Sequence, residues 1–259
     1  MKRTNPLYTI LTLIAAITWA APSTTRATDG AQVEQAKAFP LETSDRSKFE
    51  EIIRTYLLAH PEIIPEAIDK LNERNRQKRI ADLRSELETP FEGAWTGNPN
   101  GDVVIVEFFD YACGFCKRSA ADLKRLVAED PNVKIVYKEY PIISPLSAQA
   151  ARTALQAARI RKYAEFHHDM FAAKVLDKKT LRTAANKVKV KLPRDVSALD
   201  TELARNRRLA KLVGVSGTPV FIIGGQFVSG AVGYDDLKKF VDDARSPTRH
   251  ASARQNLSQ

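Results

Sequence analysis

The stretch VVIVEFFDYACGFCKRSAADL, residues 103–123, decides the fold of this chain. Residues 103–109 are a continuous β-prone run, and the residues after the two cysteines recur at helical spacing. A second β-prone run, VKIVYKEY at residues 133–140, is ended by Pro141. A strand, a helix and a second strand in this order predict a β-α-β unit with two parallel strands.

The rest of the domain changes from a helical to a strand pattern and back. Residues 145–212 are almost wholly helical in pattern, which predicts a helical insertion. The helices expected within it span residues 148–173, 179–188 and 196–212. The elements expected after it are a hairpin with strands at residues 220–223 and 226–229, and a helix at residues 234–244. This order of elements predicts an α/β fold.

The chain starts with the features of an exported protein. A basic beginning, Met1-Lys2-Arg3, precedes an apolar run over residues 7–21. The run is shorter than the ~20 residues that a membrane-spanning helix needs, so a cleaved signal peptide over residues 1–27 is favoured over an uncleaved anchor. A signal peptide combined with one pair of cysteines predicts an oxidising compartment, the bacterial periplasm.

A helical extension is expected after the signal peptide, over residues 28–92. Pro61 and Pro65 disfavour helix at the residues before them, so a break is expected near residues 60–64. Residues 89–101 are rich in Gly, Pro and Asn and predict a linker.

The extension carries a narrow apolar stripe on a charged helix. Its members recur at three- and four-residue steps: Ile64, Ile68, Leu71, Ile80, Leu83 and Leu87. Such a helix gains stability by burying its apolar face. Because a linker would separate it from the α/β domain at residues 93–245, we expect residues 46–88 to pair with other copies of the chain.

The composition excludes several classes of protein. With 259 residues, 44% hydrophobic and 27% charged, the chain is neither disordered, nor collagen-like, nor a disulfide-rich miniprotein. The net charge is +9, but the basic residues are dispersed among acids and no basic run contains interleaved aromatics. Nucleic acid is therefore not an expected partner. The basic C-terminal tail, residues 246–259, is expected to be disordered.

Cys113 and Cys116 are the only cysteines of the chain. At the start of a helix, free amide groups and the macrodipole favour an anion, so Cys113 is expected to be a thiolate at lower pH than an ordinary cysteine. Cys116 lies three residues further on the same helical face, where the two sulfurs can form a short-loop disulfide. Cys113 is therefore the expected nucleophile, and Cys116 is the expected resolving thiol.

The same spacing of cysteines also occurs in zinc sites and structural disulfides. A tetrahedral zinc site usually needs two more Cys or His ligands, and His167-His168 lacks obvious ligand spacing. No metal ligand is therefore assigned. A protein that holds Cu(I) on the two thiolates remains an alternative, and so does a scaffold with an inert disulfide.

The chain resembles the thioredoxin-fold disulfide oxidoreductases of the DsbA family. The resemblance covers about residues 95–244 and is carried by the stretch at residues 103–123, the helical insertion, and GVSGTPVFIIGGQFVSG at residues 214–230. It implies a thioredoxin fold with a helical insertion at about residues 145–212, preceded by the helical extension. It also implies disulfide exchange with exported cysteine-containing proteins, without a metal or organic cofactor, and a membrane redox partner of unknown identity.

The resemblance also assigns roles to individual residues. It implies that Cys113 is exposed, that Cys116 is buried, and that Thr218-Pro219 faces them with a cis peptide bond. Thr218, Pro219, Gly114 and Phe115 would then contact the substrate. Physical reasoning agrees for the loop, because Pro is tolerated at the first position of a strand and a cis X-Pro bond costs little.

Phe115 stands where the best-known member of the family has a histidine, which argues against a very strongly oxidising protein. The Gly114-Phe115 pair is similar to the intervening pair of periplasmic disulfide isomerases. The chemistry is therefore expected to be that of an oxidase or an isomerase. Relatives in the ScsC-like branch carry a comparable oligomerising extension, which implies a trimer formed through residues 46–88.

Glu107 is an acid in an otherwise apolar strand. The resemblance places an acid beneath the disulfide, where a raised pKa would let it pass protons to and from Cys116. The alternative is that Glu107 faces solvent at a sheet edge. Lys138 on the next strand is a candidate partner for Glu107, although solvent exposure is the favoured interpretation of this lysine.

Overall fold

The computed structural model describes residues 43–191 and 195–246. The expected signal peptide at residues 1–27 lies outside the described residues, and so does the expected tail apart from Ser246. The chain divides into two compact units, residues 1–59 and residues 60–259. Each unit is described separately.

In the first unit, helix α1 spans Thr43–Ala59. Several of its large apolar side chains are exposed: Phe49, Ile52, Ile53, Tyr56 and Leu58. Four of these follow a three- and four-residue spacing, which places them on one face of the helix. The first unit therefore presents an apolar helical face.

The second unit begins with two consecutive helices. Helix α2 spans Ile63–Asp82 and helix α3 spans Arg84–Glu88. Since α1 ends at Ala59 and α2 begins at Ile63, the break expected near residues 60–64 is confirmed.

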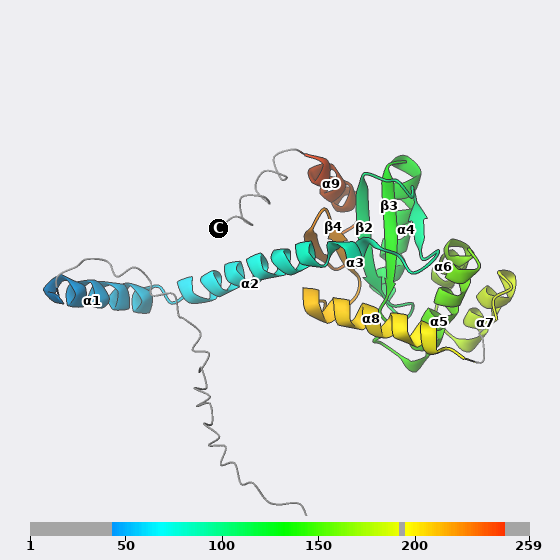
Figure 1. Cartoon of the computed structure of the whole chain (residues 1–259), viewed down its shortest axis with the longest axis horizontal. Coiled ribbons are helices and arrows are strands. Elements are labelled where there is room, and N and C mark those ends of the chain that lie inside the picture. Colours follow the sequence, from blue (N-terminus) through cyan, green and yellow to red (C-terminus); the bar gives the residue numbers. More distant parts are fainter. Residues whose placement is uncertain (1–42, 192–194, 247–259) are drawn as a thin grey trace, which may run out of the picture. The chain divides into compact units, whose positions relative to one another are not determined.

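A mixed five-stranded sheet forms the centre of the second unit (Figure 1). The strands are β1 (Trp95–Gly97), β2 (Val103–Phe109), β3 (Val133–Glu139), β4 (Val220–Ile223) and β5 (Gln226–Ser229). Their order in the sheet is β1-β3-β2-β4-β5. The central pair β2 and β3 is parallel, as expected, and every other pair is antiparallel.

The remaining helices surround the sheet. They are α4 (Gly114–Glu129), α5 (Pro145–Arg159), α6 (Tyr163–Ala172), α7 (Lys178–Lys187), α8 (Ser197–Val213) and α9 (Tyr234–Arg245). Helices α5, α6 and α7 lie together to one side of the sheet (Figure 1). The helical insertion expected at residues 145–212 is thereby confirmed in outline.

One expected helix is divided in two. The helix expected at residues 148–173 is interrupted, because α5 ends at Arg159 and α6 begins at Tyr163. Between them Arg161 has a φ of 58°, a left-handed conformation that ends a helix. Neither Gly nor Pro marks this position in the sequence, so the pattern did not reveal the break.

The expected linker at residues 89–101 is wrong. This segment contains β1, whose Trp95 lies opposite Val136 of β3, and Ala94 is fully buried. The glycine in this segment, which indicated a linker in the sequence, has another structural role. A Cβ on Gly97 would lie 2.3 Å from the carbonyl oxygen of Val133, so only glycine permits the close approach of these strands.

The sheet separates two apolar clusters. The larger one joins the odd-numbered positions of β2 and β3, such as Ile105 and Ile135, to helices α4, α5, α6, α7 and α9. The second joins the even-numbered positions, such as Val106 and Val136, to residues of α8. Residues 107 and 138 therefore lie on opposite faces of the sheet, because side chains alternate along a strand.

The apolar stripe of the extension is divided between two environments. Ile80 and Leu87 are buried in the second cluster, and Leu83 packs against it. By contrast, Ile64, Ile68 and Leu71 are about half exposed. The expectation that the whole stripe contacts other copies of the chain and not its own domain is therefore wrong. The segment after α3 is not a flexible linker but contains β1, and the end of α2 packs against the sheet.

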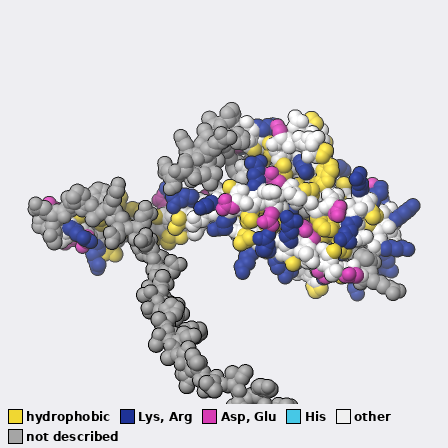
Figure 2. Space-filling view, viewed as in Figure 1, with side chains coloured by type: hydrophobic (Ala, Val, Ile, Leu, Met, Phe, Trp, Pro, Cys, Tyr) yellow, Lys and Arg dark blue, Asp and Glu magenta, His cyan; other side chains and the backbone are white. Residues whose placement is uncertain are grey.

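The sequence predicts that basic residues are dispersed among acidic ones, and the face of the second unit drawn in Figure 2 agrees. Figure 2 shows Lys and Arg side chains spread over this face of the second unit, among acidic and uncharged groups. A dispersed arrangement is typical of solvated helix faces.

Candidate active site

Cys113 lies at the end of the loop after β2 and is the N-cap residue of α4. Its backbone is extended, with φ −81° and ψ 113°, and its Sγ atom accepts a hydrogen bond of 3.3 Å from the Cys116 N–H. The two sulfurs are free thiols in this structure. The sequence between the cysteines thus builds a helix start whose first amide groups face Cys113.

The loop before β4 packs against this thiol. The Thr218–Pro219 peptide bond is cis, as expected. The Sγ–H of Cys113 donates a hydrogen bond of 3.3 Å to the carbonyl oxygen of Thr218. Two segments that are far apart in sequence therefore meet at one sulfur atom.

The two cysteines differ less in exposure than expected. Cys116 is completely buried, whereas Cys113 is 6% exposed, so the expectation of an exposed Cys113 is wrong in degree. The reason is the Thr218 carbonyl, which lies against the thiol. Phe115, directly after Gly114, is 58% exposed and stacks with the Arg118 guanidinium. The surface next to Cys113 is therefore open on the side of the helix start.

Glu107 lies inside the domain on the face of the sheet that α4 covers. It is completely buried, which excludes the alternative of a solvent-facing residue, and neither carboxyl oxygen has a partner among the described residues. Burial, and then the negative charge that Cys113 can carry, raise the pKa of Glu107 to about 8. Burial also raises the pKa of Cys116, and the charge of Glu107 adds to this effect. The protonation of Glu107 thus depends on Cys113, and that of Cys116 depends on Glu107.

Lys138 is not a partner of Glu107. It lies on the opposite face, is 1% exposed, and its Nζ donates to the carbonyl oxygens of Glu86 at 3.1 Å and Thr89 at 2.8 Å. The expected solvent exposure of Lys138 is therefore wrong, because α3 and the segment after it cover this face. Burial lowers the pKa of Lys138 to about 8.

Sequence analysis missed a second acid beside the cysteines. Asp110 is 1% exposed, and its Oδ1 accepts a hydrogen bond of 2.7 Å from the Ala112 N–H. Its Oδ2 accepts hydrogen bonds from the Ile142 and Ile143 N–H groups. The available signal was an Asp placed between a buried strand and the two cysteines.

A buried polar network connects the cysteine loop to the helical insertion. The Oε1 atom of Glu139 accepts hydrogen bonds from the hydroxyls of Tyr163 at 2.8 Å and Tyr111 at 3.3 Å. The Tyr111 hydroxyl also lies 3.2 Å from Nδ1 of His167. Burial raises the pKa of Glu139 well above its usual range. Tyr111, two residues before Cys113, is thereby fixed to helix α6.

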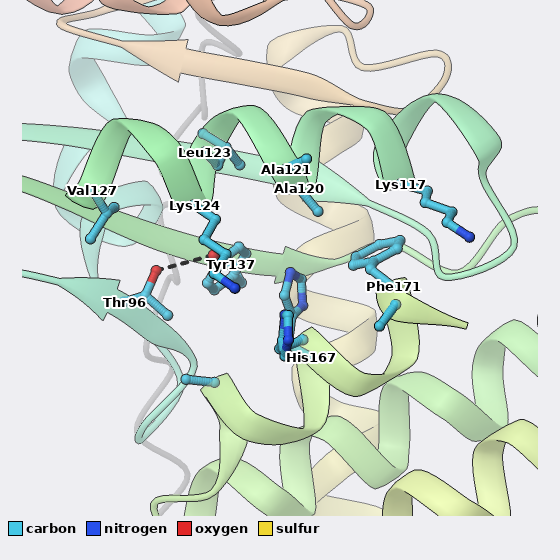
Figure 3. A pocket seen from close by; sticks show the side chains of 13 residues that line it. Thr96, Lys117, Ala120, Ala121, Leu123, Lys124, Val127, Tyr137, His167 and Phe171 are labelled. Carbon is cyan, nitrogen blue, oxygen red and sulfur yellow. Dashed lines mark hydrogen bonds between the residues drawn. The ribbon is translucent and has the colours of Figure 1, made fainter. Parts of the chain in front are cut away.

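A cavity of about 430 Å³ lies between α4 and α6 (Figure 3). Figure 3 shows Lys117 and Lys124 on the α4 side, His167 on the opposite side, and the hydrogen bond between the hydroxyls of Thr96 and Tyr137. Neither cysteine lines it. The thiol pair is therefore not part of the lining of this cavity.

The described residues contain no group of three or more His, Cys, Asp or Glu side chains arranged to hold a metal ion. None of the helices in the described part of the chain is both long enough and apolar enough to cross a membrane.

Comparison with known families gives two matches. Residues 90–243, more than half of the chain, match the family described as thioredoxin. The chain belongs to the thioredoxin family. Residues 45–78 match a second family, the N-terminal domain of the copper resistance protein ScsC. The chain is thus a DsbA-like thioredoxin-fold protein with an ScsC-like N-terminal region, which confirms the expected family and fold.

Solved structures support this membership of the thioredoxin family. A linker-deletion variant of Proteus mirabilis ScsC is 26% identical with a TM-score of 0.67, covering 80% of this chain and 98% of that chain. A periplasmic thioredoxin-like protein from Salmonella enterica serovar Typhimurium is 27% identical with a TM-score of 0.59, covering 62% and 95%.

Curated relatives match over shorter regions. The thiol:disulfide interchange protein DsbA of Bordetella parapertussis is 23% identical over an alignment of 146 residues that covers 51% of this chain and 68% of that protein. A Na⁺/H⁺ antiporter, NhaA 3 of Salinispora tropica, is 26% identical over 161 residues. The chain spans only 25% of the length of that antiporter. The family match to thioredoxin and the similarity to DsbA agree in relating this chain to thiol-disulfide oxidoreductases.

Proposed function

We propose that this protein is a periplasmic thiol:disulfide oxidoreductase that exchanges disulfides with exported proteins. The observation that carries the proposal is the position of the Cys113 sulfur, 3.3 Å from the Cys116 N–H and 3.3 Å from the Thr218 carbonyl. A helix start stabilises the sulfur anion, and the neighbouring loop provides backbone groups for a substrate.

Reduction of a substrate proceeds in two exchanges. The Cys113 thiolate attacks one sulfur of the substrate disulfide, forms a mixed disulfide and releases one substrate thiolate, which takes up a proton. Cys116 then loses its proton and attacks the Cys113 sulfur. This step closes the Cys113–Cys116 disulfide and releases the second substrate thiol. Oxidation of a substrate is the same sequence in reverse, and isomerisation uses the first exchange and its reversal without net electron transfer.

Glu107 is assigned to the proton transfers of Cys116. Because the pKa of Cys116 is raised by burial, its attack requires a nearby group that accepts the proton, and its departure requires one that donates it. Glu107, with a pKa of about 8 and no competing hydrogen bond among the described residues, fits both tasks near neutral pH. Gly114, Phe115, Thr218 and Pro219 are assigned to substrate contact.

The experiment that tests the proposal combines two measurements on the purified protein. The first is the reduction potential of the Cys113/Cys116 pair in glutathione buffers, and the second is the reactivation of a scrambled multi-disulfide protein. A pair that exchanges with glutathione, together with reactivation that depends on Cys113, supports the proposal. A pair that stays inert in every buffer contradicts it. Reactivation of a scrambled substrate separates an isomerase from an oxidase.

A second candidate function is the binding of Cu(I) by the two thiolates. The match of residues 45–78 to a domain named after copper resistance favours it, and two thiolates are ligands that Cu(I) prefers. Titration of the reduced protein with Cu(I) in competition with a chromogenic chelator tests this candidate. Stoichiometric binding without measurable disulfide exchange would favour the copper function over the redox function.

The proposal includes a homo-oligomer, a trimer, formed through the N-terminal region expected at residues 46–88. Four solved structures of Proteus mirabilis ScsC are among those similar to this chain, and residues 45–78 match the ScsC N-terminal domain. In the first unit, α1 offers exposed apolar side chains for this contact, and in the second unit the first half of α2 does so independently. Ile80 and Leu87 are excluded from it because they are buried in their own domain.

A further inference from the structure

The cavity between α4 and α6 follows the axis of α4 (Figure 3). Its lining on this helix extends from Lys117 to Val127, about 15 Å along the helix at about 1.5 Å per residue. Residues between Ala164 and Ala172 of α6 form the facing wall. The volume of about 430 Å³ is within the range of about 300–1,000 Å³ that small-molecule pockets occupy. The elongated lining favours a linear ligand over a compact one.

Short apolar side chains leave this space open. Ala120 and Ala121 line the cavity from α4, and Ala164 and Ala172 line it from α6. Alanines on both walls do not fill the gap between the two helices, and Phe171 adds an apolar ring to the α6 wall. An alkyl chain in this gap would remove apolar surface of the ligand and of the protein from water, which favours binding.

The charged side chains of the lining are basic. Among the described residues that line the cavity, none is Asp or Glu, whereas Lys117 and Lys124 both belong to it. The Nζ atom of Lys117 donates to the carbonyl oxygen of Ala173. Lys124 has no hydrogen-bond or ion-pair partner among the described residues, and Figure 3 shows its side chain directed from α4 toward the cavity. An unpaired ammonium beside an apolar gap is complementary to an alkyl chain that ends in an anion.

The opposite wall contains a buried polar atom without a partner. His167 lines the cavity from α6 and is 6% exposed. Its Nδ1 atom lies 3.2 Å from the Tyr111 hydroxyl, whereas its Nε2 atom has no hydrogen-bond partner among the described residues. An unpartnered buried polar atom costs free energy, and a ligand that supplies the partner removes this cost. His167 is thus a second observation, independent of the lysines, that points to a ligand.

We propose that this cavity binds a linear, medium-chain carboxylate. The alkyl chain lies between α4 and α6, and the carboxylate lies between the walls, where it pairs with the Lys124 ammonium and accepts a hydrogen bond from Nε2 of His167. The inference does not rest on the proposed redox function, because neither cysteine lines the cavity.

The carboxylate also decides which nitrogen of His167 carries the ring hydrogen. The Tyr111 hydroxyl donates its one hydrogen to Glu139, so in the ligand-free protein the hydrogen of the neutral ring is assigned to Nδ1, which donates to the Tyr111 oxygen. A bound carboxylate requires this hydrogen on Nε2. The Tyr111 hydroxyl then donates to Nδ1 instead of Glu139, and no proton is gained or lost.

The test compares three ligands by titration calorimetry with the full chain at neutral pH: octanoate, butanoate and octyltrimethylammonium. Affinity should rise by about fourfold for each methylene between butanoate and octanoate. The cation has the same alkyl chain as octanoate but should bind at least about tenfold more weakly. Equal affinity for the anion and the cation, or no binding of octanoate, would overturn the inference.

Variants locate the binding site. Ala121→Phe places a ring in the cavity from an exposed position of α4 and should abolish octanoate binding, and Ala164→Phe should do the same from α6. The matched control is Ala204→Phe at an exposed position of α8, the helix that packs on the other face of the sheet. It should bind as the wild type does. Binding that survives both filling variants lies elsewhere on the chain and overturns the inference.

Two further measurements test the anchors of the carboxylate. Lys124→Met should weaken octanoate binding about threefold, whereas Lys211→Met, at an exposed position of α8, should not change it. In ¹⁵N-histidine NMR spectra, saturation with octanoate should convert Nε2 of His167 from the unprotonated to the protonated type. A spectrum in which His167 keeps its tautomer, or equal effects of the two lysine variants, would overturn the assigned position of the carboxylate.

Discussion

The Cys113 thiol and the Thr218 carbonyl, 105 residues apart in sequence, are joined by a hydrogen bond of 3.3 Å. The bond connects the start of α4 to the loop before β4. Formation of a mixed disulfide would replace the thiol hydrogen of Cys113 by a substrate sulfur. The hydrogen bond to the Thr218 carbonyl would then be lost, because the sulfur no longer carries a donor.

Replacement of each cysteine should block a different step of disulfide exchange. Cys113→Ser should abolish exchange, because it removes the nucleophile, whereas Cys116→Ser should accumulate mixed disulfides, because no second thiol resolves them. Mass spectrometry after acid quenching with a disulfide substrate measures both species. Iodoacetamide labelling of the reduced wild type is the independent check. Faster alkylation of Cys116 than of Cys113 near neutral pH would reverse the assigned roles.

Replacement of Glu107 should slow the resolving step. Glu107→Gln retains the size of the side chain but cannot accept the Cys116 proton, so the decay of the mixed disulfide should slow by about 100-fold. In the wild type the decay should accelerate with pH up to about 8, where Glu107 loses its proton, and the variant should lack this inflection. Rapid-quench measurement of the mixed disulfide gives the rates.

Glu139→Gln is the matched control, because Glu139 is also a buried acid, on the neighbouring strand. Its amide oxygen can still accept the hydrogen bonds of Tyr111 and Tyr163. Decay should therefore stay close to the wild-type rate. Equal slowing in both variants would mean that the burial of any carboxyl, not proton transfer at Cys116, controls the step.

The raised pKa of Glu107 should also appear in the pH dependence of stability. The folded protein binds this proton more tightly than the unfolded chain, because the pKa is about 8 when folded and 4.5 otherwise. Between these values the free energy of unfolding of the reduced wild type should fall with rising pH, relative to Glu107→Gln, by about 1.4 kcal/mol per pH unit. Urea unfolding from pH 4 to 9 measures the difference. A difference that stays constant with pH contradicts the assigned pKa.

Lys138 should anchor helix α3. Lys138→Met removes the donor to the Glu86 and Thr89 carbonyls, so amide hydrogen exchange in residues 84–88 should accelerate about tenfold, with β2 unchanged. Lys134→Met, a half-buried position on the same strand, is the control and should leave α3 unaffected. Equal acceleration throughout the domain would indicate a general loss of stability instead of a local anchor.

Removal of the first unit should reduce the oligomer without unfolding the redox domain. Deletion of residues 28–59 removes α1 but keeps Ile80 and Leu87, which belong to the core. Mass in solution should fall from that of a trimer, and isomerase activity should fall with it, because neighbouring active sites raise the local concentration of thiols. A wild type that is monomeric at micromolar concentration would end this proposal, as would full isomerase activity after the deletion.

Much of the fold was predictable because it depends on local signals. Strand β2 was predicted at residues 103–109 and is observed there, since six of its seven residues are β-prone and an Asp lies at either end. Strand β1 was not predicted. It has only three residues, and its stability comes from pairing with β3, which the sequence of the strand itself does not show.

The site could be predicted where the type of a residue by itself indicates its chemistry. Cys113, Cys116 and the Thr218-Pro219 loop are placed together as the resemblance implied. The position of Lys138 was not predictable, because its partners are backbone carbonyls, which every residue possesses. The role of Asp110 likewise depends on amide groups 32 and 33 residues away.

The burial of Ile80 and Leu87 determines where this chain can be recombined with its relatives. The two family matches end at residue 78 and begin at residue 90, which suggests a natural joint between them. A chimera joined after residue 87 would give the redox domain a foreign helix end and lose the packing of both side chains. The part that can be exchanged without loss of core packing is the first unit, which ends at Ala59. A gene fusion that exchanges N-terminal regions should therefore be joined between α1 and α2.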